Sequence, residues 1–78
     1  MIKRELKLVI TFHTTLDAMM METVCQKQQM SGRLIPVPVS ISAGCGLAWC
    51  APPECETEIR HLMETGGIVF QAIQLYEI

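Results

Sequence analysis

The run Leu6–Phe12, which reads LKLVITF, constrains the fold of this chain more than any other segment. Its β-branched and aromatic residues predict a strand, and its nearly continuous apolar character predicts that both faces of the strand are buried. The 78 residues allow one small domain, residues 1–78. A domain of this size buries only about 60–65% of the surface that its unfolded form exposes, so its stability is marginal without a staple or a partner.

The segments after this strand predict a helix, two strands, a second helix and a final strand. Thr14 or Thr15 can cap the first helix, and Asp17 in its first turn suits the helix dipole. Pro36 and Pro38 confine the second strand to an edge of the sheet or end it early, because proline has no N–H to donate. The predicted elements are a helix over Leu16–Met30 that stops at Ser31-Gly32, strands over Arg33–Val39 and Leu47–Cys50, a helix from Pro53 that ends at Gly66-Gly67, and a strand over Ile68–Tyr76.

This order of elements predicts an α+β fold, a ferredoxin-like β-α-β-β-α-β two-layer sandwich. Right-handed crossovers give an antiparallel sheet with strand order 4-1-3-2. The first two strands then run the same way, so the end of the first strand and the connection between the second and third lie at the same end of the sheet. We therefore expect His13, the start of the first helix and the loop Gly44-Cys45-Gly46 to be neighbours.

Composition excludes several classes of protein. Half of the residues are apolar, which excludes a disordered chain, and six Lys or Arg against eight Asp or Glu disfavour a nucleic-acid binder. No apolar run approaches the roughly 20 residues that span a membrane, and no signal-peptide pattern opens the chain. We expect a cytoplasmic protein whose four cysteines are free thiols, with no cofactor and no membrane contact.

Among the four cysteines, Cys45 has the surroundings that thiol chemistry requires. Gly44 and Gly46 permit positive φ angles and leave the sulfur unobstructed, and successive N–H groups in such a loop can form an anion-binding nest. A nearby helix N-terminus, opened by Thr14, would lower the pKa of the thiol and favour the nucleophilic thiolate. His13 is either a base or proton relay for this thiol or a solvated turn residue. The alternative for the loop is a plain hairpin turn.

The other three cysteines predict less chemistry. Cys25 and Cys55 fall on the apolar faces of the two helices and are expected to fill the core. Cys50 could resolve an oxidised Cys45 as a disulfide, but the strand between them is expected to hold them too far apart. The spacing C-x4-C-x4-C departs from the paired knuckles of structural zinc sites, so a metal site is a less favoured hypothesis.

Several features along the chain occur together: Phe12 in the first strand, Ala18 and Glu22 in the first helix, Ile35-Pro36-Val37-Pro38, and Cys45-Gly46-Leu47-Ala48. This arrangement resembles a small bacterial family of selenium/sulfur carrier-like proteins over nearly the whole chain. The resemblance implies that Cys45 is the carrier cysteine, and that the partners are a cysteine desulfurase and a sulfur-relay acceptor. It assigns no role to Cys50 or Cys55. The family often has a basic residue after the second proline, where this chain has Val39.

The favoured functional hypothesis is a carrier that accepts sulfur or selenium on Cys45, rather than a turnover enzyme. The alternative is a structural or regulatory module that assembles through an exposed strand edge and a methionine-rich surface around residues 19–21. A thiol-ligated metal protein is the third hypothesis. A homodimer is also plausible for so small a core, although prolines at a strand edge discourage pairing there.

Overall fold

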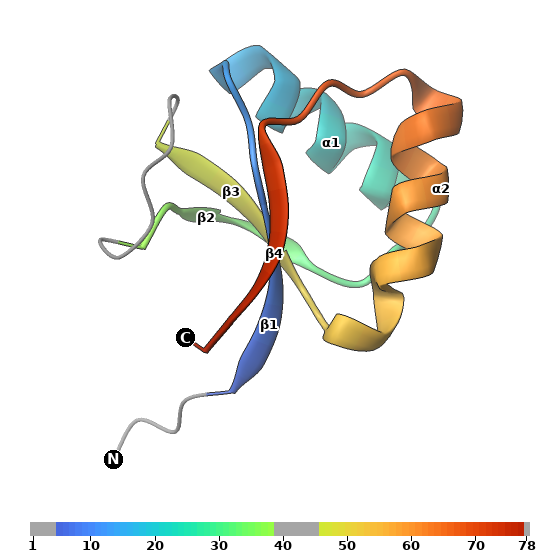
Figure 1. Ribbon diagram of the computed structural model, residues 1–78. Helices are drawn as coiled ribbons and strands as arrows, with labels where there is room; N and C mark the ends of the chain where they lie inside the picture. Colours follow the sequence, from blue (N-terminus) through green and yellow to red (C-terminus); the bar gives the residue numbers. More distant parts are fainter. Residues whose placement is uncertain (1–4, 39–45, 78) are drawn as a thin grey trace.

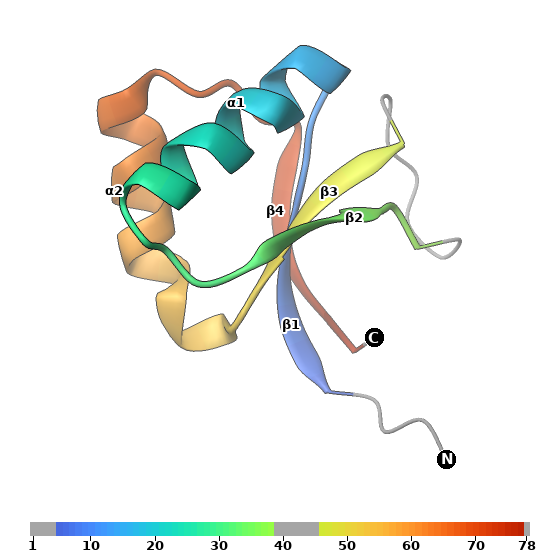
Figure 2. The same cartoon turned by 180° about the vertical axis from the view of Figure 1, so that it is seen from behind.

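The computed structural model describes residues 5–38 and 46–77, which form two layers. A four-stranded antiparallel sheet makes one layer, and two helices cover one of its faces (Figures 1 and 2). No helix within the described ranges is long and apolar enough to cross a membrane. The elements are β1 Leu6–Thr11, α1 Thr15–Lys27, β2 Arg33–Pro36, β3 Leu47–Ala51, a 3-10 turn Pro53–Cys55, α2 Glu56–Gly66 and β4 Ala72–Glu77.

The strands lie in the order β2-β3-β1-β4, which reads β4-β1-β3-β2 from the opposite edge. β1 is therefore an inner strand with a neighbour on each side. Its Ile10 lies opposite Trp49 of β3 on one side and opposite Ile73 of β4 on the other. The α+β class predicted from the sequence is confirmed.

Both faces of β1 are buried, as the run Leu6–Phe12 predicts. Leu8, Ile10 and Phe12 face the helices and belong to the main core cluster. Val9 faces the other way and is also buried. Apolar residues from both helices complete the core. They are Ala18, Met21 and Cys25 of α1 and Ile59, Leu62 and Met63 of α2.

The first helix begins as predicted but ends earlier. Thr14 is its N-cap, and the Thr14 hydroxyl accepts a hydrogen bond from the Asp17 N–H at 3.2 Å. The predicted stop at Ser31-Gly32 is wrong, because Gln29 adopts a left-handed conformation with φ of 54°. The N–H of Met30 then donates to the Cys25 carbonyl at 2.8 Å, which closes a Schellman motif directly after Lys27.

The same motif ends α2 and corrects the predicted start of the last strand. Gly67 takes the left-handed conformation with φ of 66°, and the N–H of Ile68 donates to the Met63 carbonyl at 3.0 Å. Ile68 and Met63 are both buried, which supplies the apolar contact typical of this motif. Residues 68–71 therefore form the helix cap and a connection, and β4 begins only at Ala72.

Gly32 has a different role from the helix stop that the sequence suggested. Its φ is 131°, and a Cβ atom there would lie 2.5 Å from Nε1 of Trp49 and 2.8 Å from the Cys50 carbonyl oxygen. The Trp49 ring is buried, and its Nε1 has no hydrogen-bond partner. Gly32 thus allows the chain to pass directly against the indole as it enters β2.

The substitution Gly32→Ala should destabilise the protein by about 2 kcal/mol or more, since it adds both a steric clash and a strained φ angle. Gly66→Ala is the matched control, because its Cβ would meet other atoms only at ordinary contact distances of 3.8 Å and beyond. Urea unfolding of the two variants measures the difference. Equal midpoints for the two variants would contradict the proposed packing of Gly32.

Candidate functional site

The predicted carrier cysteine, Cys45, and its neighbour Gly44 lie outside the described residues, as does Val39. The remaining predicted site residues are described. They are Gly46, at the end of that loop, His13 and Thr14, which follow β1, and Cys50, in β3. The site is therefore built from the chain on either side of residues 39–45.

The two ends of this segment are held together. The last residue pair of β2 and β3 joins Pro36 to Leu47, and the N–H of Val37 donates to the Gly46 carbonyl at 2.9 Å. β2 ends at Pro36 rather than at the predicted Val39, since Pro36 and Pro38 offer no N–H for a longer ladder. One backbone hydrogen bond beyond the ladder thus joins the described chain on either side of residues 39–45.

Gly46 has the backbone conformation that the sequence analysis proposed for the glycines around Cys45. Its φ is 80°, which is a region that residues with a Cβ rarely adopt. It is exposed, and no heavy atom lies within 4 Å of the position a Cβ would take. Glycine is therefore selected here by backbone conformation and not by lack of space.

The base of this loop lies at the same end of the sheet as the end of β1. Thr11, the last residue of β1, pairs with Ala48, one residue after Leu47 begins β3. His13 and the N-cap Thr14 follow directly, so α1 starts at this end of the sheet (Figure 1). The start of α1 and the start of β3 therefore lie at the same end of the sheet, and the expected place of Gly44 and Cys45 beside them stays a prediction.

Neither His13 nor Thr14 forms a hydrogen bond with Val37 or Gly46. His13 is exposed. The Thr14 hydroxyl is fully used within the helix cap, since it also donates to Oδ2 of Asp17 at 2.9 Å. Thr14 thus fixes the start of α1. The N-terminus of that helix therefore lies at this end of the sheet.

Cys25 is part of the core, as predicted. Its side chain is fully buried in the main cluster, and this burial raises the pKa of the thiol from 9.0 to about 11. At neutral pH Cys25 therefore carries its proton and has no access to solvent. It is a packing residue.

Cys55 ends the 3-10 turn before α2 and packs, half-buried, against the core. Its pKa is raised by burial first, and then by the carboxylates of Glu58 and Glu54. Both effects disfavour the thiolate. The prediction that Cys55 fills the core is confirmed in part, because its side chain reaches the core without being enclosed by it.

Cys50 lies within β3, between Val9 of β1 and Arg33 of β2. Two residues of the strand, Ala48 and Trp49, separate it from Leu47. Whether Cys50 lies too far from Cys45 for a disulfide stays a prediction, because Cys45 lies outside the described residues.

The residues around Cys50 were missed by the sequence analysis. Alternation along the strands puts Lys7, Arg33 and Cys50 on the sheet face away from the helices, where they line a hollow of about 290 Å³. Lys7 also forms an exposed ion pair with Glu5 at 3.1 Å. The sequence does not reveal this cluster, because only the register of β1, β2 and β3 brings the three side chains together.

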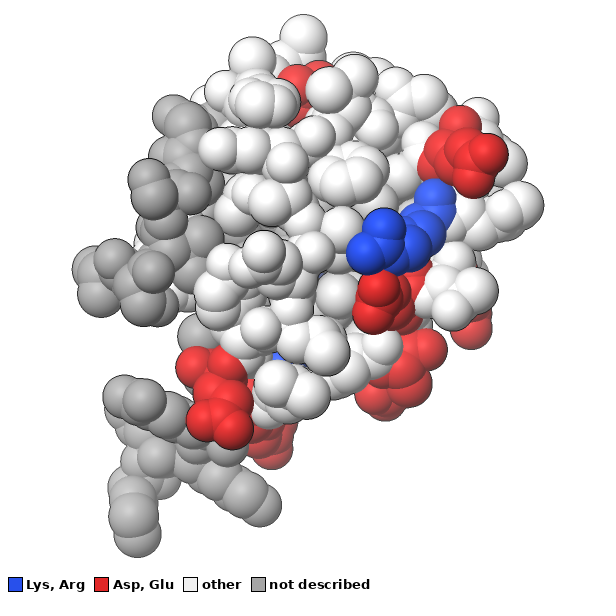
Figure 3. Space-filling view, viewed as in Figure 1, with Lys and Arg blue, Asp and Glu red and all other residues white. Residues whose placement is uncertain are grey.

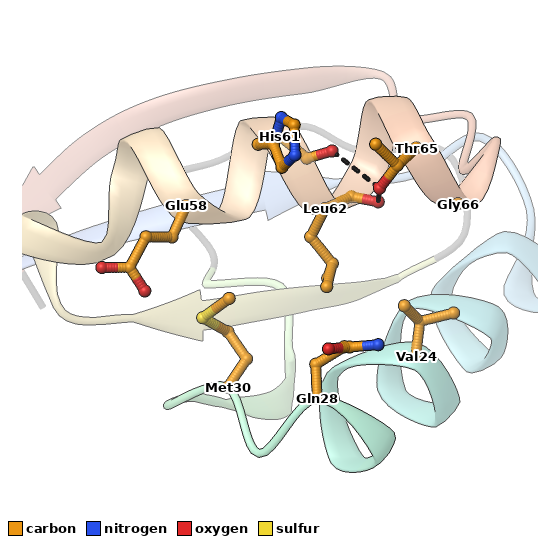
Figure 4. A pocket seen from close by; sticks show the side chains of 8 residues that line it. All are labelled: Val24, Gln28, Met30, Glu58, His61, Leu62, Thr65 and Gly66. Carbon is orange, nitrogen blue, oxygen red and sulfur yellow. Dashed lines mark hydrogen bonds between the residues drawn. The ribbon is translucent and has the colours of Figure 1, made fainter.

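A second hollow, of about 500 Å³, lies between the two helices (Figure 4). The Thr65 hydroxyl on its wall is satisfied by the carbonyls of His61 and Leu62, at 3.0 and 3.2 Å. His61 is exposed, as expected for a surface residue. The lining consists of Val24, Gln28, Met30, Glu58, His61, Leu62, Thr65 and Gly66. Among the described residues, no three His, Cys, Asp or Glu side chains are placed to hold a metal ion.

Comparison with known proteins gives one match. Residues 7–74 match the family described as "Putative Se/S carrier protein-like". The chain belongs to this family. The matched span runs from β1 into β4 and includes Cys45. No curated protein and no solved structure matches the chain.

Because the folded protein holds the Cys25 proton more tightly than an unfolded chain does, its stability should fall as pH rises. The loss should begin near pH 9, the ordinary thiol pKa, and continue to about pH 11. Two pKa units correspond to at most about 3 kcal/mol. Chemical unfolding of the wild type and of Cys25→Ala across this range measures the effect. An equally steep pH dependence in the variant would contradict it.

Arg33 should accelerate the reaction of Cys50 with anionic reagents. A unit charge about 6 Å away in water contributes about 0.7 kcal/mol, which corresponds to roughly a threefold change in rate. Arg33→Ala should slow modification of Cys50 by a negatively charged aromatic disulfide, read by peptide mass, but not by a neutral alkylating agent. Lys27→Ala, which removes an exposed charge from α1, is the matched control. Equal slowing with both reagents would contradict the electrostatic cause.

Proposed function

We propose that this protein carries sulfur or selenium as a persulfide or selenosulfide on Cys45 and passes it to a protein acceptor. The observation that carries the proposal is membership of the Se/S carrier-like family over residues 7–74. The proposal includes a cytoplasmic setting, a cysteine desulfurase as donor and a sulfur-relay protein as acceptor. We also propose that the α+β sandwich has the ferredoxin-like topology.

The environments of the other thiols support the choice of Cys45. Burial raises the pKa of Cys25 to about 11, and burial together with two carboxylates raises the pKa of Cys55. Cys50 sits within a paired strand, so its backbone has little freedom to meet the active thiol of another protein. Cys45 alone lies in the sequence between the two ends of a closed loop, next to a glycine with positive φ.

The proposed chemistry moves one sulfur atom at a time. The Cys45 thiolate attacks the outer sulfur of a persulfide on the donor, a new S–S bond forms, and the donor cysteine leaves as a thiolate. The product is Cys45–S–SH. In the second step an acceptor thiolate attacks that outer sulfur and releases the Cys45 thiolate. The transferred sulfur keeps its oxidation state in both steps, so no external oxidant or reductant is required.

The alternative is an interaction module in which Cys45 has no chemical role. One observation favours it: the outer side of α1 exposes Leu16, Met19 and Met20 at helical spacing. Contiguous exposed apolar side chains are typical of surfaces that contact other proteins. A carrier must also contact a donor and an acceptor, so this patch is compatible with both functions.

The carrier function is tested by incubating the protein with a cysteine desulfurase and cysteine, and then measuring intact mass without reductant. We expect a gain of one sulfur atom, mapped to the peptide that contains Cys45 and lost in Cys45→Ala. Cys50→Ala is the matched control and should load as well as the wild type. Repeating the reaction with selenocysteine and a selenocysteine lyase establishes which cargo is accepted.

The interaction module predicts a different result. No sulfur would be gained in the presence of an active desulfurase, and Cys45 would react with an alkylating agent no faster than an exposed model thiol. Loading of Cys50 in preference to Cys45 would also overturn the proposal.

A further inference from the structure

The two edges of the sheet differ in their protection against pairing. β2, at one edge, contains Pro36 and is followed by Pro38, and proline blocks the addition of another strand. β4, at the other edge, has six residues, no proline and no Lys or Arg. Within the described ranges, only β1 pairs with β4, so its outer edge is open.

The side chains of β4 are suited to contact with another strand. Its single charged residue, Glu77, stands at its end, and the surface over the rest of the strand is uncharged in Figure 3, where β4 lies toward the viewer. Leu75 is 45% exposed although it shares a sheet face with Ile73, which packs half-buried against the core. A long, uncharged and partly apolar edge strand is a site of strand pairing unless something covers it.

A second copy of the same strand complements this edge. In an antiparallel pair, residues directly opposite each other share a face of the sheet. A twofold axis through Gln74 places Ile73 opposite Leu75 of the second copy on the helix-covered face, and Ala72 opposite Tyr76 on the other face. An axis through Leu75 would instead place Ile73 opposite Glu77. The first register pairs apolar with apolar side chains and brings no like charges together.

We propose that the protein forms a homodimer by antiparallel pairing of β4 with β4 of a second copy, centred on Gln74. The two sheets join into one eight-stranded sheet. The two β2 strands lie at its outer edges, since β2 is at the far side of each sheet from β4. One pair of six-residue strands buries less surface than a standard stable interface, so the dimer forms in a concentration-dependent equilibrium.

Analytical ultracentrifugation of the full chain over a wide concentration range tests the interface. The wild type should shift from monomer to dimer as concentration rises. Gln74→Lys puts two like charges directly opposite each other at the twofold axis, and it should remain monomeric. Thr57→Lys makes the same charge change on the exposed surface of α2 and should dimerise like the wild type. Circular dichroism of each variant checks that the fold is intact.

The register is tested by disulfide formation under mild oxidation. Gln74→Cys should give a cross-linked dimer, identified by peptide mapping as a bond between the two introduced cysteines. Leu75→Cys should not, because its two copies would be offset by two residues on each strand, beyond the reach of a disulfide. A wild type that stays monomeric overturns the proposal. So does a Gln74→Lys variant that still dimerises, which would place the interface elsewhere, for example on the exposed side of α1.

Discussion

The structure depends on β1, the first strand in the chain, which pairs with β3 on one side and with β4 on the other. Its hydrogen bonds to β3 and β4 are made on opposite sides, while Leu8, Val9 and Ile10 are buried on opposite faces. A slip of one residue in either ladder would turn Ile10 away from the helices and Val9 toward them. The side-chain pattern of β1 therefore fixes the register of both neighbouring strands. The position of every cysteine in the sheet and helices follows from it.

This arrangement gives each described thiol a distinct environment. Cys25 lies between the sheet and the helices, where desolvation removes it from acid–base chemistry at neutral pH. Cys55 lies at the margin of the core among acidic residues, which disfavour its thiolate. Cys50 lies on the opposite face of the sheet beside two cationic side chains. Packing thus accounts for Cys25 and in part for Cys55, and the family match covers Cys45, which lies outside the described residues.

The sequence predicted the elements that depend on local patterns and missed the details that depend on contacts. Alternation and apolar periodicity were sufficient for β1 and for the buried sides of both helices. The end of α1 was misplaced because Gln29, a residue with no special preference for positive φ, adopts the left-handed conformation that was expected only of glycine. The role of Gly32 could not be predicted either, because it depends on Trp49, which is distant in sequence and reaches Gly32 only through the pairing of β2 with β3.

For the candidate site, the sequence predicted which segments lie at one end of the sheet, but not the hydrogen bond that joins the ends of the β2–β3 connection. Topology correctly brought the start of α1 and the base of the β2–β3 loop to one end of the sheet. The loop itself is closed by the Val37–Gly46 hydrogen bond, whose position is set by two prolines that end the ladder. The same prolines protect the β2 edge, which leaves β4 as the open edge. A dimer through β4 would leave β2 and its edge of the sheet outside the interface, so self-association and contact with another protein along β2 would not compete for the same surface.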